Sequence, residues 1–137
     1  MYYQDYTNVE WRLWQEKALE MLENQQKEEI LWIYDKIGNT GKTFLARYIE
    51  KQMDGCFLHT AHAGNIRRWH RDKEYVVVDH IRPTASKPQY KSIKDLKERG
   101  YKVLYLAAFP PNVKKHKEME WNVHETINND LVKLTLK

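Results

Sequence analysis

One segment constrains the fold of this chain more than any other: residues 30–51, "ILWIYDKIGNTGKTFLARYIEK". An apolar run of strand length leads into two glycines and a lysine, and apolar residues with helical spacing follow. A strand, a glycine-rich turn and the start of a helix bring several backbone N–H groups to one point, where an anion can bind. The segment therefore predicts a buried strand at 29–34, a phosphate-binding loop, and a helix at 42–53.

The loop residues have distinct expected roles. Gly38 and Gly41 have no Cβ atom, so the backbone can curve closely around an oxyanion. The ammonium group of Lys42 is expected to reach the β- and γ-phosphates of a nucleotide, and the hydroxyl group of Thr43 is expected to bind Mg²⁺. Lys42 is thus a candidate catalytic residue, and Thr43 is a candidate metal ligand.

Asn39 and Thr40 complete the predicted nucleotide-binding loop. The usual phosphate-loop pattern begins with a glycine six positions before the lysine, whereas Lys36 occupies that position here. The alternative interpretation is an ordinary turn before a helix, with the Lys42 side chain simply hydrated. The strand before the loop and the helix after it favour the phosphate loop.

A second motif follows at residues 74–79, "EYVVVD". Three consecutive valines suit a strand that is buried on both faces. A site for a nucleotide and Mg²⁺ needs an acid at the end of a strand near the phosphate loop, to hold the water shell of the metal. Asp79 is the candidate for this role, both as a catalytic residue and as a residue of the Mg²⁺ site. The alternative is an aspartate that only ends a strand in a turn.

The remaining segments alternate between strand and helix patterns. Residues 9–26 carry one apolar stripe with helical spacing, and Asn8 is a candidate N-cap. Alternation of this kind favours a mostly parallel sheet with helices on both faces. The other predicted elements are a strand at 56–59, a short helix at 63–71, a helix at 90–100 that ends at Gly100, a strand at 101–108, and two closing strands at 121–127 and 131–136.

Length and composition agree with one folded domain. The chain has 137 residues, of which 42% are hydrophobic and 31% charged. We therefore expect a single α/β domain over 1–137, with an N-terminal helix at 9–28, a nucleotide-binding core at 29–127 and a closing strand at 128–137. No apolar run approaches the roughly 20 residues of a membrane span, and the first residues do not resemble a secretory signal. The single cysteine, Cys56, excludes an internal disulfide and suits a reducing intracellular location.

The net charge of +4 favours an anionic partner. Two basic segments, 65–71 and 112–117, are candidate contacts with single-stranded nucleic acid, because arginine and lysine bind phosphates and an aromatic ring stacks on a base. No recognition-helix pattern points to duplex DNA. The alternative for both segments is a hydrated charged surface, with the tryptophan facing the core. The candidate contact residues are Arg67, Arg68, Trp69, Arg71, Lys114, Lys115 and Lys117.

Several segments, taken in order, resemble a known family. They are "WRLWQEKALEML", "ILWIYDKIGNTGKTFLARYI", "VVVDHIRP", "VLYLAAFPPN" and "WNVHETI". Together they resemble the superfamily 3 helicase domain, an AAA+-like P-loop ATPase, of the replication initiators (Rep) of viruses and plasmids with circular single-stranded DNA. The likeness spans residues 11–127. It implies ATP and Mg²⁺ as cofactors, and an ATPase that assembles as a homo-oligomeric ring, usually a hexamer, on single-stranded nucleic acid, with DNA favoured over RNA.

The same resemblance assigns roles to individual residues. It implies that Gly38, Gly41, Lys42 and Thr43 bind the nucleotide and Mg²⁺. It also implies that Asp79 is the acid of the second motif. These are the residues that the loop and the valine-rich strand already indicate.

This chain departs from the family pattern at three places. Ala108 stands where the family has an asparagine that senses the γ-phosphate, and Met119-Glu120 stand where it commonly has Asp-Arg, whose arginine is a candidate finger. The segment that carries a DNA-contacting hairpin in the family is also short here. Losing a positioned polar group costs about 10²–10³ in rate, and losing an arginine finger costs about 10³–10⁵. We therefore expect ATP binding to persist and hydrolysis to be impaired.

Three functional hypotheses remain open. One is an ATP-dependent helicase or ATPase on single-stranded DNA, acting in viral or plasmid replication in the host nucleus or cytoplasm. Another is a non-catalytic nucleotide-binding interaction module derived from a Rep helicase. A small-molecule kinase is disfavoured, because residues 82–91, "RPTASKPQYK", make a poor lid for phosphoryl transfer.

Overall fold

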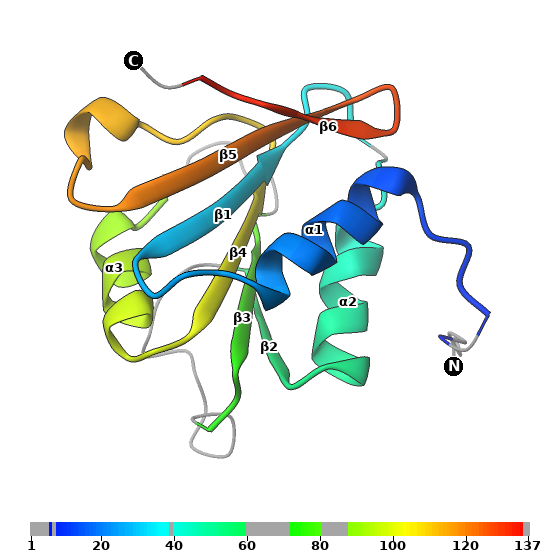
Figure 1. Ribbon diagram of the computed structural model, residues 1–137, viewed down its shortest axis with the longest axis horizontal. Coiled ribbons are helices and arrows are strands. Elements are labelled where there is room, and N and C mark those ends of the chain that lie inside the picture. The colour runs from blue at the N-terminus through cyan, green and yellow to red at the C-terminus, as the bar shows by residue number, and fades with distance from the viewer. Residues whose placement is uncertain (1–5, 7, 39, 60–71, 81–87, 136–137) are drawn as a thin grey trace.

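The computed structural model describes residue 6 and residues 8–38, 40–59, 72–80 and 88–135. These residues form three α-helices, a short 3-10 helix and six strands, arranged as Figure 1 shows. None of the helices in this described part has the length and apolar character to cross a lipid bilayer. In chain order the elements are α1 (Leu13–Glu23), β1 (Glu29–Tyr34), α2 (Lys42–Gln52), β2 (Gly55–Leu58), β3 (Tyr75–Asp79), α3 (Tyr90–Glu98), β4 (Lys102–Ala107), η3 (Val113–Lys115), β5 (Glu120–Ile127) and β6 (Asp130–Lys133).

All six strands belong to one sheet, in the order β2-β3-β4-β1-β5-β6. β1 pairs in parallel with both β4 and β5, and β3 pairs in parallel with both β2 and β4. Within this described sheet, β6 at one edge is the antiparallel strand, and it pairs with β5. The prediction of a mostly parallel sheet with two closing strands is confirmed.

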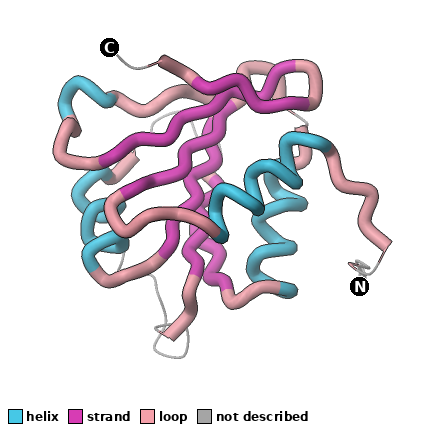
Figure 2. The backbone as a smooth tube through the Cα atoms, in the orientation of Figure 1, coloured by secondary structure: helices cyan, strands magenta, loops and turns pink. Residues whose placement is uncertain are grey.

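The helices cover both faces of the sheet, as Figure 1 and Figure 2 show. α1 and α2 pack on one face, where Leu31 and Ile33 of β1 contribute to the core. α3 packs on the other face, where Ile30 and Trp32 of the same strand contribute. Alternate side chains of a strand point to opposite faces, so β1 is buried on both sides. Helices on both faces of the sheet were also predicted. The arrangement makes β1 a central, buried strand that supports the loop after it.

The first helix is shorter than predicted. The pattern predicted a helix at 9–26, but α1 begins after Arg12, which is extended (φ −74°, ψ 149°) and is the N-cap in place of Asn8. Trp11 lies before the helix, and its ring meets the ring of Tyr48 in α2 edge-on, with centroids 4.6 Å apart. An extended segment, not a helical turn, therefore provides the first part of the predicted apolar stripe.

The other helix and strand boundaries differ from the predictions by a few residues. α3 ends at Glu98, and Gly100 follows with a φ of +97°, a left-handed conformation that stops a helix. β6 is shorter than predicted, because it ends at Lys133. The short helix predicted at 63–71 lies outside the described residues.

A two-residue turn joins β5 to β6. Asn128 and Asn129 have φ values of +51° and +66°, the left-handed conformation that type I′ hairpin turns need and that asparagine tolerates. The backbone N–H of Trp14 donates to the carbonyl of Asn129 at 3.1 Å, and the ammonium of Lys17 donates to Asp130 at 2.6 Å. The closing hairpin therefore holds the start of α1 in place.

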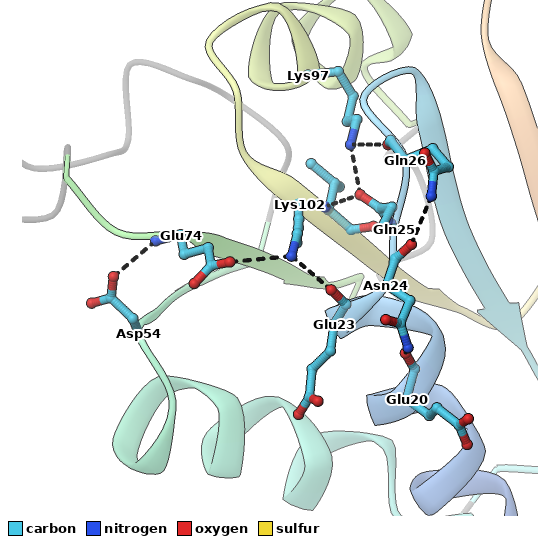
Figure 3. A network of polar contacts seen from close by, with 10 residues as sticks. Glu20, Glu23, Asn24, Gln25, Gln26, Asp54, Glu74, Lys97 and Lys102 are labelled. Carbon is cyan, nitrogen blue, oxygen red and sulfur yellow. Dashed lines mark hydrogen bonds and ion pairs between the residues drawn. The ribbon is translucent and has the colours of Figure 1, made fainter.

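Buried polar side chains connect α1, β4 and α3 at the amino end of the parallel strands (Figure 3). Gln25 follows α1, and its Nε2 donates to the carbonyl of Val103 at 2.8 Å while its Oε1 accepts the N–H of Val103 at 2.7 Å. The ammonium of Lys97 also donates to this Oε1, at 2.6 Å. Lys102 donates to the carbonyl of Glu23 at 2.6 Å. We call Gln25, Lys97, Lys102 and their backbone partners the amino-end network.

Candidate anion-binding site

The glycine loop lies where two neighbouring strands direct the chain to opposite faces of the sheet. β1 leads into α2 on one face. The adjacent β4 leads to the other face, where His116 stacks on Tyr90 of α3 with ring centroids 3.8 Å apart. Parallel strands that diverge in this way leave a crevice at their carboxyl ends, the usual position for ligands in open α/β sheets. The predicted loop is therefore located at this crevice.

The loop backbone has the shape that its glycines allow. Gly38 and Gly41 have φ values of +88° and +91°, which would strain a residue with a side chain. Lys42 is the first residue of α2, and no side chain caps this helix end. The first N–H groups of a helix lack intrahelical partners and carry the positive end of the helix dipole. The loop can therefore attract an anion; its predicted member Asn39 lies outside the described residues.

Asp35, directly after β1, is a site residue that the sequence analysis missed. It is 2% exposed, and its Oδ1 accepts the N–H of Gly38 at 2.7 Å. Its Oδ2 accepts the hydroxyl of Thr40 and the ammonium of Lys42. Burial raises the pKa of this carboxyl group, but hydrogen bonds from Lys42, Thr40 and Gly38 outweigh burial and lower the pKa overall. Asp35 is therefore an internal anion held by the glycine loop.

The two predicted motifs meet beside α2. The hydroxyl of Thr43 donates to the carboxylate of Asp79 at 2.8 Å, although 36 residues separate the two. Asp79 is 5% exposed, and the Nδ1 atom of His59 lies 3.4 Å from its backbone carbonyl oxygen. β4 lies between the strands that carry the loop and Asp79. The fold thus brings the start of α2, which follows β1, next to the end of β3, although β1 and β3 are not neighbours in the sheet.

A cleft of about 300 Å³ contains residues of both motifs. Ala108, which follows β4, lines it with a methyl group where an asparagine would offer an amide. Lys42 and Asp79 therefore lie on the same side of the molecule and border the same space. The polar side chains in its wall belong to Asp35, Lys36, Lys42, Thr43, Asp79 and His80.

The site offers oxygen ligands for a metal ion. The described residues contain no cluster of three or more His, Cys, Asp or Glu side chains that could hold a metal by themselves. Beside a nucleotide, however, Mg²⁺ takes one or two protein oxygens and completes its shell with water and phosphate oxygens. The Thr43 hydroxyl and the Asp79 carboxylate, 2.8 Å apart, fit that requirement.

A larger cleft, of about 440 Å³, also borders the loop. Its walls come from Trp14 of α1, from Lys36 and Ile37 of the loop, and from residues 125–129 of the closing hairpin. The side chain of Ile37 is 93% exposed. This larger cleft is formed largely by elements that the sequence analysis did not connect with the glycine loop.

The basic candidates for nucleic-acid contact are described only in part. Lys114 and Lys115 lie in η3, Lys117 follows it, and all three are exposed. Their exposure fits both a contact surface and a hydrated charged surface. Outside the described residues lie the other four candidates: Arg67, Arg68, Trp69 and Arg71.

The position of the expected arginine finger is remote from the loop of its own chain. Met119 is 8% exposed and packs in the core. Glu120 begins β5 and pairs with Glu29 at the start of β1, at the opposite end of the strand from the glycine loop. A side chain at this position therefore lies far from the glycine loop of its own chain.

The chain was compared with protein-family models, with curated proteins and with solved structures, and none of the three comparisons gave a match. The functional interpretation therefore rests on the residues of the site and their geometry.

Proposed function

We propose that this protein binds ATP and Mg²⁺ at the glycine loop. The observation that carries the proposal is the convergence of Lys42, Thr43 and Asp79 on one cleft at the start of α2. The helix start and the loop amides provide hydrogen-bond donors for phosphate oxygens, and the ammonium of Lys42 adds a positive charge. Thr43 and Asp79 would hold Mg²⁺ and its water, and the ion would offset the negative charge of the phosphates.

The proposed fold is that of a P-loop NTPase of the AAA+-like, superfamily 3 type. The strand order supports this proposal, because β1 and its loop are central and the strand with Asp79 lies beyond β4. The position of the loop at a crevice between diverging parallel strands is the position at which such sheets bind nucleotides. The larger cleft, beside Trp14 and residues 125–129, offers room for the base and ribose.

When the triphosphate binds, a phosphate replaces the carboxylate of Asp35 as the anionic partner of Lys42. In the described conformation Lys42 donates to the carboxylate of Asp35. A phosphate oxygen accepts the same kind of charge-assisted hydrogen bond. Lys42 therefore changes partner when the nucleotide enters, and Asp35 keeps its bonds to Gly38 and Thr40.

Hydrolysis is proposed to be slow. Ala108 lines the cleft with a methyl group, so this position provides no polar atom to orient an attacking water. In the helicase interpretation, which the resemblance supports, the domain acts on single-stranded DNA as a homo-oligomer, and Lys114, Lys115 and Lys117 are contacts. The second candidate, a non-catalytic nucleotide-binding interaction module, is favoured by the apolar character of Ala108.

Calorimetric titration with Mg·ATP tests the binding proposal. We expect Lys42→Ala to weaken binding by about 100-fold or more, because it leaves phosphate charge without its cation. The matched control is Lys51→Ala, in the last turn of the same helix, where the side chain is 61% exposed and pairs with Glu50. Equal affinities for Lys42→Ala and wild type would overturn the proposal.

Phosphate release separates the two functional candidates. A helicase domain predicts turnover that rises when single-stranded DNA is added, and that disappears in Lys42→Ala. The interaction module predicts tight Mg·ATP binding with no release of phosphate, with or without DNA. Turnover of about one per second, an ordinary enzymatic rate, would reject the module.

A further inference from the structure

Two side chains of α1 hold the backbone of the glycine loop. The indole Nε1 of Trp14 donates to the carbonyl of Thr40 at 2.9 Å, and the amide Nε2 of Gln15 donates to the carbonyl of Gly41 at 3.0 Å. Each pair is 26 residues apart in the sequence. Trp14 is fully buried and Gln15 is 3% exposed, so water does not compete strongly for these bonds.

These bonds fix the direction of the N–H groups that a phosphate needs. In a planar trans peptide the C=O and N–H groups point to opposite sides. With the carbonyls of Thr40 and Gly41 held towards α1, the N–H groups of Gly41 and Lys42 must point away from α1. Those N–H groups lie at the start of α2, where an anion would accept them. The carbonyl of Gly41 also accepts the N–H of Leu45 at 3.2 Å, so Gln15 and the first turn of α2 together orient the Gly41–Lys42 peptide.

Gly41 is adapted to this contact as well as to the left-handed turn. A Cβ atom at this position would lie 2.7 Å from Nε2 of Gln15. Even without the φ of +91°, a side chain here would therefore push the glutamine amide away from the carbonyl. The absence of a side chain at Gly41 permits the approach of α1.

The start of α1 is itself held in place from two directions. The N–H of Trp14 donates to the carbonyl of Asn129 in the closing hairpin at 3.1 Å. The Oε1 of Gln15 accepts the N–H of Arg12 at 3.0 Å, which fixes the orientation of the glutamine amide so that its Nε2 faces Gly41. Both donors to the loop therefore have defined positions before any ligand arrives.

We propose that Trp14 and Gln15 are positioning residues for the anion loop: they hold the Thr40–Gly41 and Gly41–Lys42 peptides so that both N–H groups face the phosphate. Gln15 contacts the loop and lines neither of the two clefts assigned to the nucleotide, whereas Trp14 contacts the loop and also lines the larger cleft. This inference rests on the proposed function, since it concerns the same triphosphate site. A loop that is ordered in advance binds more tightly, because less ordering has to occur on binding.

The chain contains a matched control for Gln15. Gln25 is also buried (7% exposed), and it also donates through Nε2 to a backbone carbonyl and accepts a backbone N–H through Oε1, both of Val103. It lies in the amino-end network, away from the loop. We therefore expect Gln15→Met to weaken Mg·ATP binding about tenfold or more. Gln25→Met should lower the unfolding temperature more than Gln15→Met does, yet leave the Kd within about twofold of wild type.

Trp14→Phe and Trp32→Phe form a second matched pair. Both tryptophans are fully buried, and the Nε1 of Trp32 donates to the carbonyl of Phe109 at 2.8 Å, on the other face of the sheet. Trp14→Phe should weaken Mg·ATP binding, and Trp32→Phe should not. Trp14 also lines the larger cleft, so pyrophosphate, which has no base or ribose, separates the two effects. A weakening as large for pyrophosphate as for Mg·ATP assigns the loss to the phosphate-binding amides, and a loss confined to Mg·ATP would contradict the positioning role of Trp14.

The outcomes separate this inference from the proposed function. If wild type binds Mg·ATP but the variants of Trp14 and Gln15 bind it as tightly, the positioning role is wrong and the proposed function stands. Equal losses in the test and control variants would also contradict the positioning role, since loss of general stability would explain them. If wild type binds neither Mg·ATP nor pyrophosphate, the proposed function is wrong, and this inference is wrong with it.

Discussion

The two ends of the parallel strands place similar residues in different surroundings. At the amino end, Lys97 is 7% exposed and donates to the neutral amide oxygen of Gln25. At the carboxyl end, the Lys42 side chain is 16% exposed and donates to the carboxylate of Asp35. The partner of Lys97 is held by β4 within the amino-end network. The partner of Lys42 borders a cleft of about 300 Å³.

The two lysines differ in what their partners do for a buried charge. A neutral partner does not offset the cost of burying a charge, so burial lowers the pKa of Lys97 to about 8. A carboxylate partner does offset that cost, and another anion can take its place. The amino end therefore connects α1, β4 and α3 through buried hydrogen bonds, while the carboxyl end contains an ion pair that, in the proposed function, exchanges with a phosphate.

The largest effect that tests this comparison is expected from Asp35→Asn. The change leaves the Lys42 ammonium without its buried counter-ion, so we expect the free energy of unfolding to fall by about 3 kcal/mol at neutral pH. Saturating Mg·ATP should raise the unfolding temperature of this variant more than that of wild type, because the triphosphate supplies the missing anion. An equal or smaller rise would contradict the exchange of anions at Lys42.

Measuring stability at acidic pH provides a control for Asp35→Asn. The pKa of Asp35 in the folded protein is below the ordinary value of 3.8. Its contribution to stability is therefore complete above pH 3.8 and is lost as the pH falls through the folded-state pKa. The difference in stability between wild type and Asp35→Asn should narrow below pH 3.8, as measured by urea unfolding.

A smaller effect is expected at the amino end. The folded-state pKa of Lys97 is about 8 and the ordinary value is 10.5, so between these values the unfolded chain binds more protons than the folded one. The free energy of unfolding contributed by Lys97 therefore rises with pH from about 8 to 10.5, by an amount on the order of 2 kcal/mol. Comparing the urea unfolding of wild type with that of Lys97→Met across this pH range isolates the contribution of the Lys97 ammonium. If both proteins show the same pH dependence, the buried ammonium is not the cause.

The smallest effect is expected from Thr126→Val, next to the turn of the closing hairpin. The buried hydroxyl of Thr126 has no hydrogen-bond partner among the described residues, in contrast to the amide of Gln25. Valine has nearly the same shape and removes this unsatisfied group, so we expect the free energy of unfolding to rise by about 1 kcal/mol. A loss of stability in thermal unfolding would indicate that the hydroxyl is bonded after all.

The fold was largely predictable because its signals are local. The apolar run at 29–34 and the three valines before Asp79 are patterns of adjacent residues, and both strands form as predicted, with β3 one residue shorter at its start. The glycines at 38 and 41 mark turns with a left-handed backbone, a conformation that is strained for residues with a side chain. The prediction was weaker for α1, where the side chain of Trp11 continues the apolar stripe but its backbone is not helical.

The parts of the site that escaped prediction depend on contacts between distant segments. Asp35 resembles an ordinary turn residue in the sequence, and its one signal is its position at the end of a buried strand. Gln15 is a polar residue beside an apolar stripe, and no local signal marks it as buried, yet it lies against Gly41. The contact between Gln25 and Lys97 joins residues 72 positions apart. No local pattern specifies such pairs.

Titration of Mg·ATP into isotopically labelled protein, followed by backbone amide NMR, tests the central claim most directly. The account predicts that the largest shifts occur at Gly38, Gly41, Lys42 and Thr43, with a smaller shift at Asp79, while the amides of the amino-end network remain unchanged. Shifts confined to the amino end, or no shifts at saturating Mg·ATP, would contradict it.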